Sequence, residues 1–161
     1  MAEIKKEVRS IGQRISGLQA GETYTFVLKR PKPTADLTNA RRCIKLTTGY
    51  LETARLAVDE LEQAHQHAGF GDITEAQRSV QRAKRCVERI GIALWEARGH
   101  AENAKEDATD SPGDTKSAYD LGAKAADLSI QHAEWIAKGI EESMRAVSAF
   151  VDEASTRTLE Q

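Results

Sequence analysis

Residues 73–108 read ITEAQRSVQRAKRCVERIGIALWEARGHAENAKEDA, and apolar side chains recur along them at alternating steps of three and four. The series consists of Ile73, Ala76, Val80, Ala83, Val87, Ile90, Leu94, Ala97, Ala101, Ala104 and Ala108. A 3.5-residue period held over several heptads is typical of a long helix in a coiled coil or helical bundle. The stretch therefore predicts one helix over about 73–108 with a continuous apolar seam.

The same alternation flanks this stretch on both sides. One series runs from Leu37 to Ala68 and is broken only by Thr47 and His65, and a third runs from Tyr119 to Ala154 without a break. These series predict two further helices, over about 36–68 and 116–156. Together the three helices make a bundle domain that we expect to span residues 35–158.

The connections between the predicted helices are short. Gly69-Phe70-Gly71 ends the first helix, Asp72 caps the second with Glu75 as its capping-box partner, and residues 110–114 (DSPGD) precede the third. Short connections force successive helices to run antiparallel. Facing residues then have numbers that add up to about 141 across the first turn and about 225 across the second. The predicted fold is all-α, a long antiparallel three-helix, coiled-coil-like bundle.

The first 34 residues differ from the rest. Five apolar residues at helical spacing, Ile4, Val8, Ile11, Ile15 and Leu18, predict a short amphipathic helix. Residues 23–29 then alternate like a strand, with Tyr24, Phe26 and Leu28 on one side, and Lys29 and Arg30 follow. Residues 1–34 contain seven Lys or Arg against three Asp or Glu, whereas the remainder holds sixteen against twenty-two. We therefore expect an extended basic arm joined to an acidic rod.

Composition restricts the class of protein. The 161 residues carry a net charge of −2, so the whole chain has no electrostatic attraction to nucleic acid or to acidic membranes. No stretch approaches the roughly 18 apolar residues of a membrane span. Antiparallel pairing separates Cys43 from Cys86 by about 18 Å along the rod, too far for a disulfide. We expect a cytoplasmic protein with reduced thiols and no membrane span.

The residues that could support chemistry do not converge. Glu62 and His65 have the Glu-x-x-His spacing of helical metal sites, but the predicted register places His65, His100 and His132 at three different levels of the rod. Neither cysteine has a histidine at helical spacing that could activate it. The sequence therefore predicts no catalytic residue, metal ligand or cofactor site.

Four arginines, Arg78, Arg82, Arg85 and Arg89, lie on one face of the second predicted helix. Such a stripe could follow the phosphates of a nucleic acid. It could also pair with acidic residues of the neighbouring helix, because the register places Arg82 opposite about Asp59 and Arg89 opposite about Glu52. No aromatic residues interleave the stripe to stack bases, which favours the structural interpretation.

Large apolar side chains also lie outside the heptad seams. The register brings together Leu46, Tyr50, Ile92 and Trp95, and a second strip on the third helix holds Leu121, Leu128 and Trp135. Side chains of this size require a cover, which can be the N-terminal helix or a partner. The candidate interaction residues are therefore Tyr24, Phe26, Leu28, Lys29, Arg30, Leu46, Tyr50, Trp95 and Trp135.

These features favour a non-enzymatic protein that binds other protein surfaces. We expect a homo-oligomer or a subunit of a larger assembly, held together by the bundle surface and the N-terminal arm. A helical nucleic-acid-binding or nuclease-related module that uses the arginine stripe is the first alternative. An amphipathic bundle that binds a lipid or polymer surface is the second.

Overall fold

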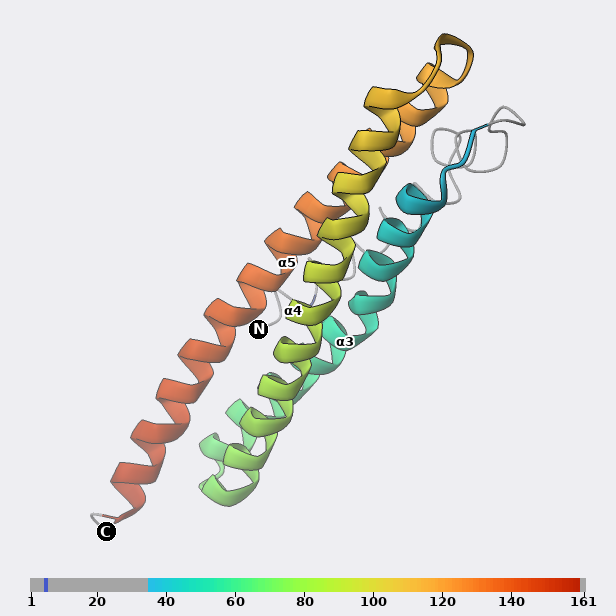
Figure 1. Ribbon diagram of the computed structural model, residues 1–161. Helices are drawn as coiled ribbons and strands as arrows, with labels where there is room; N and C mark the ends of the chain where they lie inside the picture. Colours follow the sequence, from blue (N-terminus) through green and yellow to red (C-terminus); the bar gives the residue numbers. More distant parts are fainter. Residues whose placement is uncertain (1–4, 6–34, 160–161) are drawn as a thin grey trace.

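The computed structural model describes Lys5 and residues 35–159. Within this part, α3 (Thr38–Gly69), α4 (Ile73–Asp110) and α5 (Gly113–Leu159) pack against one another, and no strand is present (Figure 1). The predicted all-α fold is thus confirmed for the described residues. The predicted N-terminal helix and the extended arm lie outside them, apart from Lys5.

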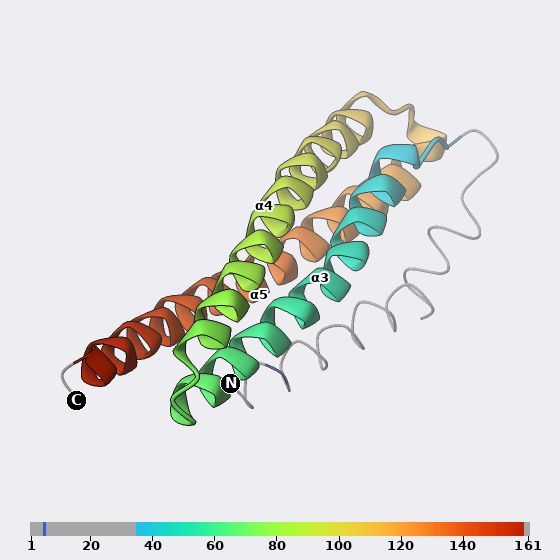
Figure 2. The ribbon, with the colours of Figure 1, turned by 90° about the horizontal axis from the view of Figure 1, so that it is seen from below.

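The connections between the helices lie at opposite ends of a rod (Figure 1). Contacts between α3 and α5 keep a constant difference in residue number. The Tyr50 hydroxyl donates a hydrogen bond to the Ala133 carbonyl, and the Cys43 thiol donates one to the Ala126 carbonyl; the residues of each pair are 83 apart in the sequence. A constant offset means that α3 and α5 run in the same direction. α4 runs in the opposite direction and packs against both, and Figure 2 shows the three helices side by side along the rod.

Local hydrogen bonds fix the helix ends. α3 begins at Thr38 rather than near residue 36, because the Asp36 carboxylate accepts the Thr38 amide at 2.9 Å and serves as a local cap. At the next turn Gly71 has φ 82°, a left-handed conformation that favours glycine. The Asp72 carboxylate accepts the Glu75 amide at 3.2 Å, as predicted, but the Asp72 amide donates to the His67 carbonyl at 2.9 Å and not to the Glu75 side chain, so the reciprocal half of the capping box is absent.

The third helix begins earlier than predicted, at Gly113 instead of about residue 116. The Pro112 carbonyl accepts the backbone amides of Thr115 and Lys116, each at 3.0 Å, so the first turn starts directly after the proline. Proline suits this position because its φ is already helical and its missing N–H is not needed there. The Lys116 ammonium also donates to the Ala108 carbonyl, which ties the start of α5 to the end of α4.

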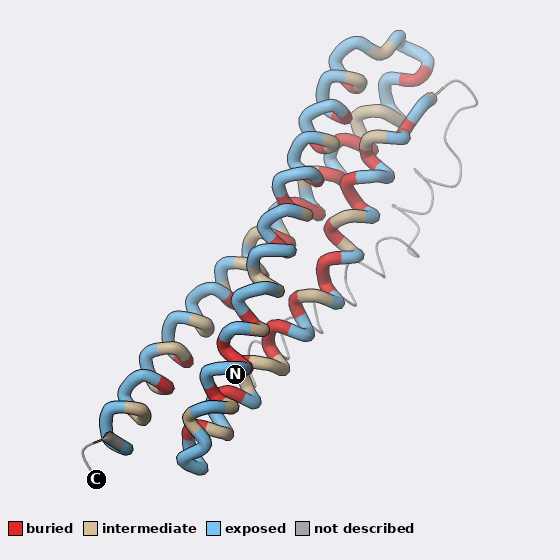
Figure 3. The backbone as a smooth tube through the Cα atoms, turned by 60° about the horizontal axis from the view of Figure 1, so that its bottom comes forward, coloured by how far each residue is buried: buried red, intermediate tan, exposed pale blue. Residues whose placement is uncertain are grey.

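The heptad seams form the core. Most seam residues are buried and the others are half-buried, except His65 of α3, which is exposed. Figure 3 shows the buried residues along the inner faces of the helices. The core is wider than the seams on α3, where four further residues at seven-residue spacing are also buried: Cys43, Tyr50, Ala57 and Ala64. Tyr50 was expected at the surface, and this prediction is wrong.

The core is divided into a larger and a smaller cluster. The larger one contains Leu61, Val58 and Ile140, and the smaller one is composed mainly of alanines together with Cys43 and Ile130. Alanine removes little apolar area from water, so the alanine-rich end stabilises the bundle less per residue. Toward its C-terminal end α5 diverges from the connection between α3 and α4 in every view (Figures 1, 2 and 3).

Candidate interaction surfaces

The outward face of α4 carries a continuous polar stripe, which we call the outer stripe. Its ten residues follow alternating steps of four and three: Arg78, Arg82, Arg85, Arg89, Ile92, Glu96, Gly99, Asn103, Glu106 and Asp110. All are exposed except Arg82, which is half-buried. One half of the stripe is basic and the other half is acidic or neutral. The predicted arginine face is therefore one end of a longer pattern.

The four arginines have different neighbours. Arg78 forms an ion pair with Glu75 within α4, whereas the Arg82 Nε lies 2.8 Å from the Glu60 Oε2 of α3. The expected partner of Arg82 was about Asp59, one residue away. Arg85 and Arg89 have no ion pair with any residue in the described part of the chain. The pairing of arginines with α3 thus holds for Arg82 and does not extend along the stripe.

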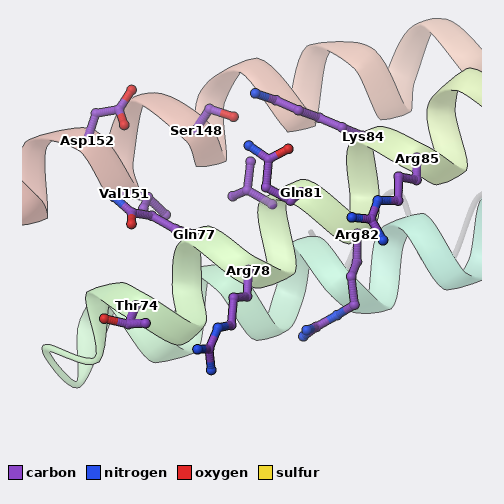
Figure 4. Close-up of a pocket in the computed structure, with 11 residues that line it drawn as sticks. Thr74, Gln77, Arg78, Gln81, Arg82, Lys84, Arg85, Ser148, Val151 and Asp152 are labelled. Carbon is purple, nitrogen blue, oxygen red and sulfur yellow. The ribbon is translucent and has the colours of Figure 1, made fainter.

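A groove of about 750 Å³ lies between α4 and α5, near the connection from α3 to α4. Its lining includes Val80 and Val151 and four cations, Arg78, Arg82, Lys84 and Arg85, with Asp152 as the one carboxylate among the lining residues. Figure 4 shows Lys84 extending toward α5, whereas Arg78 and Arg82 extend away from it. The groove itself was not predicted.

Ion pairs join α4 to α5 on the side of this groove. The Lys105 Nζ lies 3.2 Å from the Asp127 Oδ1, and the Arg98 Nε lies 2.7 Å from the Glu134 Oε1. The residue numbers of each pair add up to 232, because these long side chains flank the seam, whereas the Lys116–Ala108 contact adds up to 224 and agrees with the predicted value of about 225. The same value follows from the Arg82–Glu60 pair, whose numbers add up to 142, and the 83-residue offset between α3 and α5.

The same register explains where the groove opens. One heptad from the Arg98–Glu134 pair, Gly91 of α4 lies opposite Glu141 of α5. Two heptads from it, Lys84 lies opposite Ser148. Lys84 and Ser148 both line the groove. The series of ion pairs thus stops at Gly91, which has no side chain to pair with Glu141, and opposite Lys84 α5 supplies a small hydroxyl in place of a carboxylate. A serine at this flanking position was the sequence signal that could have revealed the groove.

A second groove, of about 520 Å³, lies between α3 and α4. Leu46, Tyr50 and Ala93 line it together with three cations, Arg42, Lys45 and Arg89. Leu46 is half-buried, and the Tyr50 side chain is almost fully buried. The expected cluster of Leu46, Tyr50, Ile92 and Trp95 is therefore divided, because Ile92 and Trp95 do not line this groove.

Both tryptophans of the chain lie at the surface. Trp95 on α4 is 76% exposed and Trp135 on α5 is 51% exposed, as their positions outside the seams predicted. They occupy the same level of the rod, since Trp95 precedes Arg98 by one turn and Trp135 follows Glu134 directly. Ile92, which is 66% exposed, lies one turn before Trp95.

Lys5, the one described residue of the N-terminal segment, contacts the bundle. The Lys5 Nζ lies 3.0 Å from the Asp59 Oδ1 and 3.0 Å from the Glu62 Oε2, both on α3. These two carboxylates raise the pKa of Lys5, chiefly through the hydrogen bond to Asp59. The other candidate arm residues, Tyr24, Phe26, Leu28, Lys29 and Arg30, lie outside the described residues.

The histidines and cysteines, which are the side chains most suited to catalysis or metal binding, are not gathered into one site among the described residues. His100 and His132 lie at different levels of the rod, because the His100 Nδ1 is 3.3 Å from the Asn39 Oδ1 and the 83-residue offset places Asn39 beside about residue 122 of α5. Within residues 35–159 and Lys5, no three His, Cys, Asp or Glu side chains are grouped to hold a metal ion. Cys43 and Cys86 are free thiols, and burial raises the pKa of both.

No family model, curated protein or solved structure matches this chain. None of the described helices has a stretch long and apolar enough to cross a membrane.

Proposed function

We propose that this chain is a non-enzymatic protein-interaction or assembly protein. It acts through the surface of a long antiparallel, coiled-coil-like bundle and through the N-terminal arm formed by residues 1–34. The single observation that carries the proposal is the exposure of Trp95 and Trp135 at one level of the rod. Both residues lie outside a bundle core that is filled without them.

Tryptophan is a costly residue to leave in water and a favourable one to bury in an interface. Each aromatic side chain buries roughly 150–250 Å² when it is covered, and tryptophan is enriched among the residues that dominate binding energy. Ile92 adds apolar surface beside Trp95, and the Arg98–Glu134 ion pair supplies a polar neighbour. An apolar centre with charged surroundings is the usual composition of a protein interface.

The titratable groups favour binding over catalysis. The described groups whose pKa departs from its ordinary value are one buried and one half-buried thiol, a buried phenol, two lysines in ion pairs, and the carboxylate of Asp36 beside the start of α3. Each of these shifts has a local structural cause. Active sites more often shift the pKa of several groups within one cleft.

The arm supports the proposal through its charge. Residues 1–34 are basic and the remainder is acidic, so electrostatic attraction draws the arm to a rod surface. The contact of Lys5 with Asp59 and Glu62 is one example of this attraction within a single chain. Exchange of arms between two copies would use the same charges.

Nucleic-acid binding stands second. The groove between α4 and α5 contains four cations, which is the electrostatic requirement for phosphate binding. None of the described residues that line it is aromatic, so the groove offers no surface on which bases could stack. The acidic half of the outer stripe would also repel a phosphate backbone that continued along α4.

A photo-crosslinking amino acid at position 95 or 135 tests the proposal in cells that make the protein naturally. We expect discrete protein adducts from both positions, whether with another copy or with a different protein. The matched control is the same amino acid at Lys138, an exposed position one turn from Trp135. If positions 95 and 135 give no more adducts than position 138, the surface around Trp95 and Trp135 is not an interaction surface.

A further inference from the structure

We propose that the outer stripe of α4 binds the outer stripe of a second copy in antiparallel orientation, which gives a two-fold symmetric dimer. This inference rests on the proposed function and names one partner for it. It follows from the order of charges along α4, where Arg78 and Arg82 lie toward one end and Glu106 and Asp110 toward the other.

The stripe is complementary to itself when it is reversed. Its steps of four and three read the same from either end, so every stripe position of one copy meets a stripe position of the other. In this register Arg78 faces Asp110 and Arg82 faces Glu106, and symmetry repeats each pair. An isologous interface requires this kind of self-complementary patch.

The centre of the paired stripes carries exposed apolar side chains: Ile92, which faces Glu96 of the other copy in this register, and the adjacent Trp95. The two-fold axis falls between Ile92 and Glu96, and Trp95 lies next to it on the side of α5. Burial of both copies of Ile92 and Trp95 supplies the hydrophobic part of the interface. Gly99, which meets Arg89, has no atom within 4 Å of the position of a Cβ, so the arginine side chain has room.

The existing ion pairs of the arginines are compatible with this arrangement. Arg82 uses its Nε toward Glu60 and one terminal nitrogen toward Ser79, and a guanidinium has five N–H donors. Among the described residues, Arg78 forms its ion pair within its own helix, with Glu75. Both arginines therefore retain donors for a carboxylate of a second copy.

Other occupants match only part of the stripe. A nucleic acid fits the arginines but is repelled by Glu96, Glu106 and Asp110, and the basic arm of residues 1–34 fits only the acidic half. Parallel pairing of two stripes would set arginines against arginines. A partner must carry both charges in the reverse order, and a second copy of α4 does so.

Charge reversal tests the proposal in the full-length chain. We expect wild type to dimerise at low salt and to dissociate as salt is added, because exposed charge pairs are screened. The double variants Arg78→Glu/Arg82→Glu and Glu106→Arg/Asp110→Arg should each weaken the homodimer by at least about tenfold, since reversal converts attraction into repulsion. An equimolar mixture of the two should form a heterodimer, because all four facing pairs are again of opposite sign.

Lys84→Glu is the matched control, since Lys84 lies on the same helix but off the stripe and in the groove. It should leave dimerisation unchanged. Sedimentation equilibrium measures the association, and circular dichroism verifies that each variant is folded. Arg78→Glu/Arg82→Glu also removes the ion-pair partner of Glu60 and can therefore destabilise the fold. In that case the test rests on the Glu106→Arg/Asp110→Arg variant and on the salt dependence of the wild-type dimer.

Several results would overturn the proposal. One is a wild-type chain that stays monomeric at every protein concentration and every salt concentration. Another is a dimer that is unaffected by either charge-reversal variant but is lost when residues 1–34 are deleted. Salt-dependent binding of RNA or DNA by a monomer that loses it in Lys84→Glu would assign the arginines to nucleic acid. Crosslinking from position 95 to a different protein, with no dimer, would leave the proposed function standing and remove only this inference.

Discussion

The Tyr50 hydroxyl of α3 donates a hydrogen bond of 2.8 Å to the Ala133 carbonyl of α5, inside the core. The bond crosses between helices that are not consecutive in the chain, and it shares its offset with the contact of Cys43 to Ala126. Burial raises the pKa of Tyr50 well above its ordinary value. The phenol therefore remains protonated in the folded protein at pH values where the unfolded chain ionises.

Replacing Tyr50 by Phe should lower the free energy of unfolding by about 1 kcal/mol near neutral pH, the usual net value of one hydrogen bond. The phenol stabilises the fold fully below its unfolded pKa of about 10, and this contribution is lost as the pH rises above that value. Urea unfolding followed by circular dichroism, at neutral and at strongly alkaline pH, measures both effects. Equal loss of stability at alkaline pH in wild type and Tyr50→Phe would contradict this account of the buried phenol.

Ile140→Asp should unfold the bundle or lower its free energy of unfolding by on the order of 3–5 kcal/mol, because it buries an unpaired charge. Ile140 has no exposed surface, whereas Val87, a seam residue of α4, is half-buried and would be a less decisive site. Leu56→Asp serves as the control, since Leu56 is 57% exposed. Thermal melts that cannot distinguish the two variants would show that the seam is misassigned.

Two glycines should respond to alanine in opposite ways. Gly49 lies within α3 with no atom within 4 Å of a Cβ, so Gly49→Ala should stabilise the fold by about 1 kcal/mol through helix propensity. At Gly122 a Cβ would lie 3.2 Å from the Leu37 Cδ2 and 3.4 Å from the Ala40 Cβ. Gly122→Ala should gain less, and Gly122→Val should cost about 1–3 kcal/mol by overpacking. A similar gain at both sites in chemical denaturation would refute the close approach of α5 to α3.

Deletion of residues 1–34 should leave the helical signal of the bundle nearly unchanged. Lys5 is joined to Asp59 and Glu62 by partly exposed ion pairs, and such pairs are worth about 0–1 kcal/mol each. Arm exchange predicts that the deletion lowers the association state, whereas pairing through the outer stripe predicts that dimerisation persists. Light scattering on the truncated and full-length chains decides between them, and a large loss of helical signal would show that the bundle depends on the arm.

The heptad pattern was sufficient for the all-α fold and for most of the core, because a 3.5-residue period directly encodes a buried helical face. It placed Trp95 and Trp135 at the surface, where the structure has them. Tyr50 was assigned wrongly because a three-helix arrangement buries a flanking position on α3 as well as the seam. The start of α5 at Gly113 depends on how Pro112 and Lys116 begin the helix, which a period cannot reveal.

The most direct test of the central claim, that the outward face of α4 is an association surface used first by a second copy, is the molar mass of the unmodified full-length chain. Light scattering across a concentration series at low salt should approach twice the mass of one chain, and added salt should return it toward one. The mass of a single chain at every concentration, or a larger assembly indifferent to salt, would contradict the claim.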